Sequence, residues 1–134
     1  MKYAFILLLG VLIFNSCSNQ NNFPPAENAL VAAQQFLDGC MKGDFKRAGF
    51  YIQQDSVNEA QLKALEDAYY HNTSDQRVEY RTANIIIEND ETVSPKEEII
   101  TYQNSYDKIT RKLKAVQTEK GWKVDLKYTF SGNL

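Results

Sequence analysis

The chain has 134 residues, with 15 basic and 17 acidic side chains, one histidine and two cysteines. A nearly balanced charge without a concentrated basic stripe excludes the usual electrostatic footprint of a nucleic-acid-binding protein. The length suffices for one compact domain. The sequence has no zinc-type cluster of Cys and His, no phosphate-binding glycine loop and no serine nucleophile elbow, so we expect neither a metal nor a cofactor.

The start of the chain has the layout of a lipoprotein export signal. Lys2 supplies a positive charge, residues 3–14 are almost entirely apolar, and Ser16 precedes Cys17. The apolar run is too short to span a bilayer comfortably. We expect cleavage after Ser16, acylation of Cys17 and anchoring in the outer membrane, facing the periplasm. An ordinary secretory signal with an accidental cysteine and a membrane helix are the alternatives.

The chain then divides into a tether and a folded domain. We predict a signal peptide over 1–16, a lipidated cysteine with a flexible polar tether over 17–25, and one domain over 26–134. A lipidated Cys17 could not form a disulfide, so Cys40 has no partner. Its helical spacing with the apolar residues before it predicts burial in the core.

Helical patterns occupy the first half of the domain. The first two predicted helices, 26–42 and 44–53, meet at Gly43, which ends one, and Asp44, which caps the next. A third helix begins at Ser56, which opens a capping box, and continues with apolar residues at helical spacing.

Extended patterns occupy the second half. Predicted strands cover 77–88, 99–106, 108–118 and 122–130, and the hairpin signal 119–121 precedes the last of them. A turn is expected between the first two strands directly after residue 88. Three helices followed by about four strands predict an α+β fold, with the helices packed on a curved antiparallel sheet.

Two segments resemble the nuclear transport factor 2-like superfamily, also described as cystatin-like. Residues 43–48 (GDFKRA) are similar to the turn after its first helix, and residues 120–125 (KGWKVD) are similar to its closing hairpin. The ending 16–18 (SCS) resembles the signals of Bacteroidetes-type lipoproteins, some of which carry such domains without a known activity. The resemblance covers roughly 26–130 and implies a cone with a cavity at its open end. Its members include enzymes and binding subunits, so the fold leaves the function open.

An aromatic set is the first candidate for a pocket. The side chains are Tyr51, Tyr69, Tyr80, Tyr102 and Trp122. Such residues could line an apolar cavity and offer hydroxyl groups to a small molecule. They could equally fill the cone as core residues.

Arg111 is the second candidate. Alternation with Ile109 and Leu113 places it on the core-facing side of a strand. There it could pair with Glu79 or Glu98, or bind an anionic ligand at the mouth of the cone. A bulge that turns Arg111 outward is the alternative.

An enzyme of this shape would need an acid or a base inside the cavity. His71 is the one histidine and could serve as such a base, but its place at a helix end also suits a solvent-exposed role. Asp38 is a further candidate base, although a solvated helix face explains it equally well. The acidic run 88–91 lacks the spacing and glycine of a calcium loop.

Two further features point to surface roles. Apolar residues on both faces of the predicted strand 77–87 would suit a homodimer formed through the sheet. Residues 55–57 (DSV) resemble the O-glycosylation signal of exported Bacteroidetes proteins, which would modify Ser56. A capping role for the same hydroxyl is the competing interpretation.

We therefore expect a membrane-anchored domain that binds a small molecule, a glycan fragment or a protein partner without catalysis. An isomerase- or dehydratase-like enzyme and an interaction domain acting through its sheet face are the alternatives. A cavity containing His71 or Asp38 would favour the enzyme. A tyrosine-lined cavity would favour ligand binding, and a filled cone would favour the interaction domain.

Overall fold

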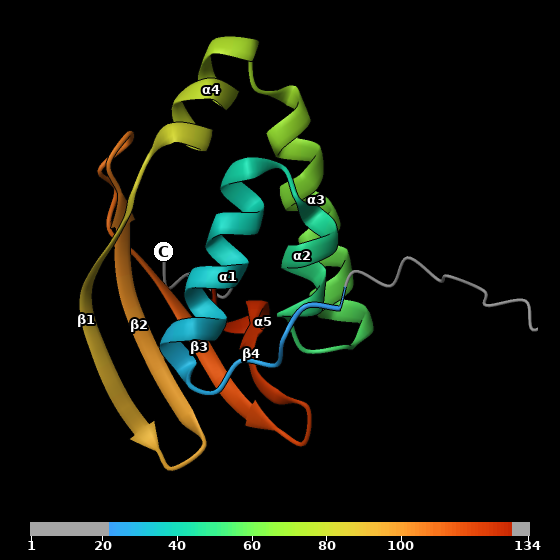
Figure 1. Ribbon diagram of the computed structural model, residues 1–134, viewed down its shortest axis with the longest axis vertical. Coiled ribbons are helices and arrows are strands. Elements are labelled where there is room, and N and C mark those ends of the chain that lie inside the picture. Colours follow the sequence, from blue (N-terminus) through green and yellow to red (C-terminus); the bar gives the residue numbers. More distant parts are fainter. Residues whose placement is uncertain (1–21, 130–134) are drawn as a thin grey trace, which may run out of the picture.

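The computed structural model describes residues 22–129, which form one sheet and a group of helices (Figure 1). Their order is α1 (Ala29–Lys42), α2 (Phe45–Phe50), α3 (Ser56–His71), α4 (Ser74–Thr82), β1 (Ile85–Ser94), β2 (Glu97–Asn104), β3 (Arg111–Thr118), β4 (Gly121–Asp125) and α5 (Leu126–Thr129). The α+β class and the antiparallel sheet of four strands agree with the prediction. The helix count differs, since four helices precede the sheet and a short one follows it. The predicted signal peptide and lipidated Cys17 lie outside the described residues.

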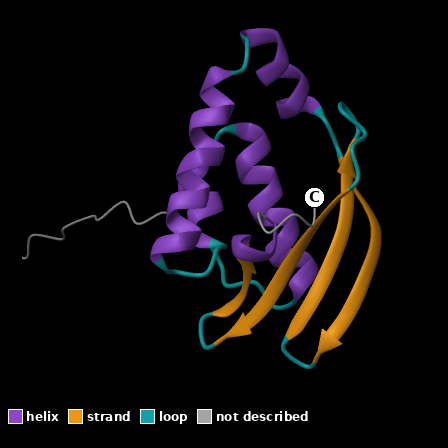
Figure 2. Ribbon diagram, turned by 180° about the vertical axis from the view of Figure 1, so that it is seen from behind, coloured by secondary structure: helices purple, strands orange, loops and turns teal. Residues whose placement is uncertain are grey.

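The molecule has three layers. The sheet is one layer, α1 lies across its inner face, and α2 and α3 lie on the far side of α1 (Figure 2). The α3–α4 pair rises beyond the end of α1, so that α4 lies near the loop between β2 and β3 (Figure 1). The helices therefore cover one face of the sheet and also reach past one of its ends.

Each strand of the sheet pairs with the next strand in the chain, in the order β1-β2-β3-β4. The outer edge of β4 is closed by two segments from the helical half. Ala26 pairs with Trp122 in antiparallel fashion, and Ile52 pairs with Val124 in parallel fashion. Three backbone hydrogen bonds of 2.7–3.0 Å support these two pairings. Such pairing satisfies backbone groups that an open edge would leave to solvent.

The first two helices begin and end where local chemistry requires it. The Asn28 side chain accepts a hydrogen bond from the N–H of Val31 at 2.9 Å and caps α1. Gly43 ends this helix in the left-handed conformation, with φ of 75°, and Asp44 caps α2. Both boundary predictions at Gly43 and Asp44 are confirmed. The helix starts later than predicted because Ala26 is paired with β4.

Asp55, rather than Ser56, caps α3. Its carboxylate accepts hydrogen bonds from the N–H groups of Val57 and Asn58 at 3.1 and 2.9 Å. The prediction that the Ser56 hydroxyl caps this helix is therefore wrong, because the preceding carboxylate takes that place. Ser56 is exposed on the first turn of α3. Its O-glycosylation stays a prediction.

The predicted strand 77–88 is wrong over its first half, which belongs to α4. Thr73 and Gln76 form a reciprocal capping box that starts this helix, with hydrogen bonds of 3.2 and 3.0 Å. Strand β1 begins only at Ile85 and continues through the expected turn to Ser94. Because part of the predicted strand is helical, the two-faced apolar pattern no longer supports a sheet-mediated homodimer, which stays a prediction.

The last predicted strand is also shorter than expected. The fully buried Asn58 accepts a hydrogen bond from the N–H of Leu126 at 2.7 Å and donates to Asp125 at 3.4 Å. These contacts turn the chain out of β4 and into α5. Alternation over 122–130 predicted a strand throughout, but a long-range side-chain contact ends it at Asp125.

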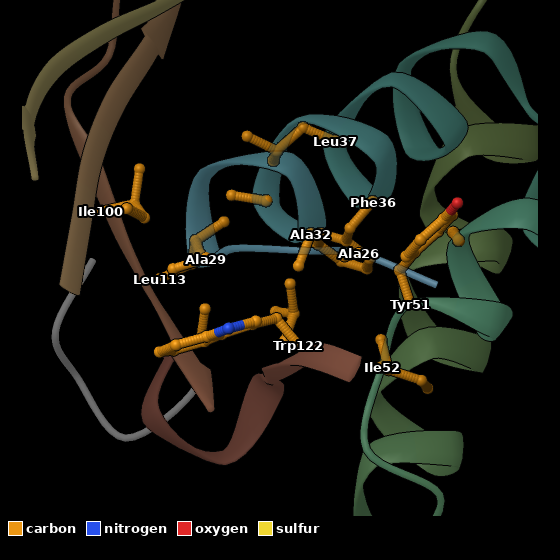
Figure 3. Packing of buried hydrophobic residues seen from close by; sticks show 14 of the residues in the cluster. Ala26, Ala29, Ala32, Phe36, Leu37, Tyr51, Ile52, Ile100, Leu113 and Trp122 are labelled. Atoms are coloured by element: carbon orange, nitrogen blue, oxygen red, sulfur yellow. The ribbon is translucent and has the colours of Figure 1, made fainter. Parts of the chain in front are cut away.

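The core lies between α1 and the sheet. Small side chains of α1, among them the fully buried Ala29 and Ala32, let the helix approach the strands closely (Figure 3). Ile100, Leu113 and Trp122 meet them from the sheet (Figure 3). Burial of these apolar surfaces supplies most of the driving force for folding. The core thus fills the middle of the domain between α1 and the sheet.

Candidate functional site

A cavity of about 210 Å³ lies at the end of the domain where α4 approaches the β2–β3 loop. Its walls come from the end of α1, the start of α2, the last turns of α3, α4 and the adjacent ends of β2 and β3. Two parts of the wall differ in chemistry. The helical side is apolar, and its residues are Leu37, Cys40, Met41, Phe45, Leu65 and Ala68. The other side carries polar groups from Tyr69, Asn72, Tyr80, Tyr102, Asn104, Asp107 and Arg111.

An ion pair dominates the polar side. Arg111 at the start of β3 makes two parallel hydrogen bonds to Asp107, with Nη1–Oδ1 at 3.0 Å and Nη2–Oδ2 at 2.7 Å. The Asp107 carboxylate also accepts the N–H of Ile109 at 3.0 Å. The side chains of Asp107 and Arg111 are 11% and 25% exposed, respectively. A bidentate pair of this kind holds the guanidinium in one plane and cancels its charge locally.

The electrostatics of the pair follow from its geometry. Burial raises the pKa of Asp107. Hydrogen bonds from Arg111, from the N–H of Ile109 and from the Asn104 side chain, together with the charge of Arg111, outweigh burial and lower this pKa to about 2. The hydrogen bond to Asp107 also raises the pKa of Arg111. Both groups are therefore ionised at neutral pH, and together they present no net charge to the cavity.

Two further polar side chains reach the cavity from the inner face of β2. Tyr102 and Asn104 are 9% and 6% exposed, respectively, and both line the cavity. The side-chain oxygen of Asn104, Oδ1, accepts the N–H groups of Tyr106 and Asp107, at 3.0 and 2.9 Å. The Asn104 side chain also hydrogen-bonds the Asp107 carboxylate. Within residues 22–129, the Tyr102 hydroxyl has no hydrogen-bond partner. Buried polar groups normally have one, so this hydroxyl is available to a bound molecule.

Burial keeps two ionisable groups of the cavity neutral. It raises the pKa of the Tyr102 hydroxyl to about 12, and it raises the pKa of the Cys40 thiol to about 12 as well. The prediction that Cys40 is buried in the core is confirmed only in part, because Cys40 is partly buried and packs against the core cluster from outside it. A thiol that stays protonated is a weak nucleophile, so Cys40 acts as apolar wall.

Tyr80 links α4 to the polar side of the cavity. Its hydroxyl donates to Asp107 Oδ2 at 3.4 Å, and its ring meets that of Tyr106 edge to face at 5.0 Å between centroids. Burial, followed by the charge of Asp107, raises the pKa of Tyr80. The helix that sequence patterns missed is thereby fastened to the β2–β3 loop.

The structure brings together four of the six residues predicted to line a pocket, namely Tyr69, Tyr80, Tyr102 and Arg111. The other two lie elsewhere. Tyr51 is 1% exposed and donates to the Pro24 carbonyl at 2.8 Å, and Trp122 packs in the core under α1 (Figure 3). For Tyr51 and Trp122 the alternative of core filling applies, because the chain entering the domain covers both of them.

The predicted partners of Arg111 and the candidate bases lie away from this arrangement. Arg111 faces the cavity as predicted, but Ile109, expected on the same face, precedes β3 and is 54% exposed. The partner of Arg111 is Asp107 instead of Glu79 or Glu98. His71 is exposed at the end of α3, where Nδ1 lies 2.6 Å from the Asp67 carbonyl. Asp38 forms ion pairs with Lys42 and Arg47 on the helical surface. Neither His71 nor Asp38 lines the cavity.

Sequence reasoning did not identify Asn104 and Asp107. Both stand in the connection between two strands, where Asn and Asp commonly accept backbone N–H groups. An acidic residue four positions before an inward-facing arginine is a signal that could have indicated the pair. The conformation that joins them includes Lys108 with φ of 57° and is not visible in periodicity.

Comparisons with known protein families, characterised proteins and solved structures found no match to this chain. No helix within residues 22–129 combines the length and apolar character that crossing a membrane requires. Across the same residues, no three His, Cys, Asp or Glu side chains gather in a way that could hold a metal ion. The function is therefore argued from the geometry of the cavity.

Proposed function

We propose that this chain is a membrane-anchored envelope protein whose domain binds a small, neutral, largely apolar molecule without transforming it. The observation that carries the proposal is the unpartnered hydroxyl of Tyr102, inside a cavity with an apolar wall. A ligand with one hydrogen-bond acceptor would satisfy this hydroxyl and bury its apolar body against α1 and α3. The volume of about 210 Å³ favours a small molecule over a glycan fragment or a protein segment.

The charge state of the cavity argues for a neutral ligand. Arg111 would be the natural contact for an anion, but Asp107 already holds it in a bidentate pair. An anionic ligand would have to compete with that carboxylate and would leave it unpaired and partly buried, which is costly. A neutral carbonyl or hydroxyl compound avoids this cost.

The same geometry argues against the enzyme alternative. Asp107 is the carboxylate that lines the cavity, and its oxygens are engaged by Arg111 and the N–H of Ile109. A general base needs a pKa near the working pH and a free lone pair directed at the substrate. The low pKa of Asp107 gives it neither property.

The anchor and the family placement belong to the same proposal. Acylation of Cys17 would hold the domain at the periplasmic face of the outer membrane through the tether 17–25. A cone with a cavity at one end is also what the resemblance to the nuclear transport factor 2-like superfamily implies. Mass spectrometry of the native protein, which detects the acyl chains, tests the anchor separately from the ligand.

Three probes of nearly equal size test the ligand class. Acetophenone has a neutral acceptor, ethylbenzene has none, and benzoate is an anion. We expect saturation-transfer NMR to show acetophenone binding more tightly than ethylbenzene, and benzoate binding least. Tyr102→Phe should remove much of the difference between the first two. Preference for benzoate would overturn the proposal that the ligand is neutral. Equal binding of all three would show that the Tyr102 hydroxyl does not contribute to binding.

A matched pair of substitutions tests the location. Ala68 and Ala64 are both exposed on α3, one turn apart, but Ala68 lines the cavity and Ala64 does not. Ala68→Trp should fill the space and abolish acetophenone binding, and Ala64→Trp should leave it unchanged. Circular dichroism would verify that both variants keep their helix content. Binding that survives Ala68→Trp would place the ligand elsewhere.

A further inference from the structure

A second hollow lies at the opposite side of the helical layer, where the chain enters the domain. It is a groove of about 480 Å³ between the loop from α2 to α3, the β3–β4 hairpin, β4 and α5. Lys120, Lys123 and Lys127 line it, together with Asp55 and Glu119. Three cations against two carboxylates leave a net positive charge.

Lys123 is the unusual member of this groove. It is 6% exposed, and its Nζ donates to the Phe50 carbonyl and lies 3.9 Å from the centre of the Phe50 ring. Within residues 22–129 no carboxylate lies within ion-pair distance of it. An ammonium group has three donors, and the carbonyl and the ring face do not supply a countercharge. Buried charges are normally paired, so this one lacks its expected partner.

The charged neighbours of Lys123 do not neutralise its positive charge. Lys127 is already paired with Asp55 at 3.1 Å and lies 3.9 Å from Asp125. Lys120 is exposed and has no ion-pair partner among the described residues. Burial, followed by the charge of Lys120, lowers the pKa of Lys123, as expected for two nearby cations. The free positive charge of the groove is therefore that of Lys120 and Lys123, opposed by Glu119.

We propose that this groove binds a phosphate group, with Lys123 and Lys120 as its cationic contacts. Lysine ammonium groups act as point charges suited to phosphate, whereas planar carboxylates are matched by the fork of an arginine, which this groove lacks. The groove is larger than a phosphate ion, so the group would belong to a bigger molecule. This site is separate from the cavity that binds the neutral ligand.

The position of the groove defines two sources for the phosphate. A Cβ added to Gly121 would meet the Ala26 carbonyl oxygen at 2.9 Å and the Pro25 side chain at 3.2 Å, so the entering chain runs against this hairpin. Asn22 lies five positions after Cys17, a reach of at most about 18 Å. A lipid headgroup would therefore be within range if Cys17 is acylated, and a soluble phosphate ester is the other source. Only the lipid source rests on the proposed anchor.

The test uses the full chain, labelled with ¹⁵N, in a neutral detergent. Inorganic phosphate is titrated against sodium chloride at equal ionic strength, and amide resonances of residues 53–55 and 118–123 are followed. We expect saturable shifts with phosphate and none with chloride. Lys120→Gln should weaken binding roughly five-fold and Lys112→Gln, on the outside of β3, by less than about two-fold. Lys123→Met should abolish the shifts.

A second arm places the chain in lipid nanodiscs with and without phosphatidylglycerol. Shifts of the groove resonances that need phosphatidylglycerol would identify a lipid headgroup as the source, and shifts with soluble phosphate alone would identify a soluble ester. Either result supports the phosphate site. The proposal is overturned if neither phosphate nor phosphatidylglycerol moves these resonances, or if Lys112→Gln weakens binding as much as Lys120→Gln. Lys120 is exposed, so its variant keeps the test valid if Lys123→Met unfolds.

Discussion

The two hollows of this domain handle a partly or fully buried cation in opposite ways. At one end Arg111 meets Asp107 in a bidentate pair, so the cavity is locally neutral and its unpartnered group, the Tyr102 hydroxyl, is an uncharged donor. At the other side Lys123 is 6% exposed, and its ammonium group contacts the Phe50 carbonyl and the rings of Phe50 and Tyr51 but no carboxylate. The difference shows that burial of a charge does not by itself identify a site. What matters is whether the protein supplies the countercharge or leaves it to a ligand.

The largest expected effect comes from breaking the ion pair between Arg111 and Asp107. Asp107→Ala leaves Arg111 without its carboxylate and the N–H of Ile109 without its acceptor. We expect a loss of about 2–3 kcal/mol in the free energy of unfolding, measured by urea denaturation. Glu91→Ala, which removes an exposed carboxylate from β1, should change it by less than about 0.5 kcal/mol.

A double variant sharpens the same comparison. Asp107→Leu combined with Arg111→Met removes both charges, so the loss should be smaller than the sum of the two single losses. Additive losses would mean that the pair contributes nothing beyond its separate parts.

The next largest effect is that of acid, which should lower the free energy of unfolding by protonating Asp107. The pKa of Asp107 is about 2 in the folded protein and near 3.8 ordinarily, so the unfolded chain binds more protons between these values. The stabilisation is complete above pH 4 and is lost as the pH falls toward 2, by about 1 kcal/mol after solvent screening. Asp107→Asn should flatten that part of the stability profile. Asp55 titrates in the same range, so some slope should remain; a slope equal to that of the unmodified chain would contradict the prediction.

Removing the ammonium group of Lys123, which has no carboxylate partner, should have a smaller effect on stability. Lys123→Met takes away the desolvation cost of a buried ammonium group but also its hydrogen bond to Phe50. We expect a change of less than about 1 kcal/mol in the free energy of unfolding, in either direction. A loss as large as that of Asp107→Ala would mean that Lys123 is compensated within the protein, and the contrast between the two ends would fail.

The smallest expected effect concerns the contact between α4 and the ion pair of Arg111 and Asp107. Tyr80→Phe removes a hydroxyl whose hydrogen bond to Asp107 is long, at 3.4 Å, and keeps the ring contact with Tyr106. The free energy of unfolding should fall by no more than about 0.5 kcal/mol. Hydrogen exchange of the α4 amides should be faster than in the unmodified chain, and unchanged exchange would show that the ring alone fastens the helix.

Local chemistry explains which elements could be predicted from the sequence. The boundary at Gly43 and Asp44 and the hairpin at 119–121 depend on residues within a few positions of each other. Helix α4 was missed because Val78, Tyr80 and Thr82 alternate as a strand would, while the deciding capping box stands just before them. The alternation of side chains therefore indicated the two-residue period of a strand in a segment that is helical.

The candidate site likewise has features set by local spacing, which could be predicted, and features set by long-range contacts, which could not. Alternation with Leu113 correctly faces Arg111 inward, because a strand period is a local property. Its pairing with Asp107 depends on the shape of the loop between them, and the burial of Tyr51 and Trp122 depends on where the entering chain runs. Contacts made across the fold are not visible in composition or spacing.

The closure of the β4 edge has a consequence for how the chain folds. Neighbouring strands can pair early, since each hairpin brings together residues close in sequence. The pairings of Ala26 with Trp122 and of Ile52 with Val124, however, join the first and the last parts of the domain. We therefore expect helices α1 and α2 to reach their final places only after β4 is available, late in synthesis. If the protein is exported, this order would keep its amino-terminal half loosely structured until the whole chain has been made, which is the condition that threading through a translocation channel requires. Hydrogen exchange on a chain shortened before residue 121 would reveal it as weak protection of α1.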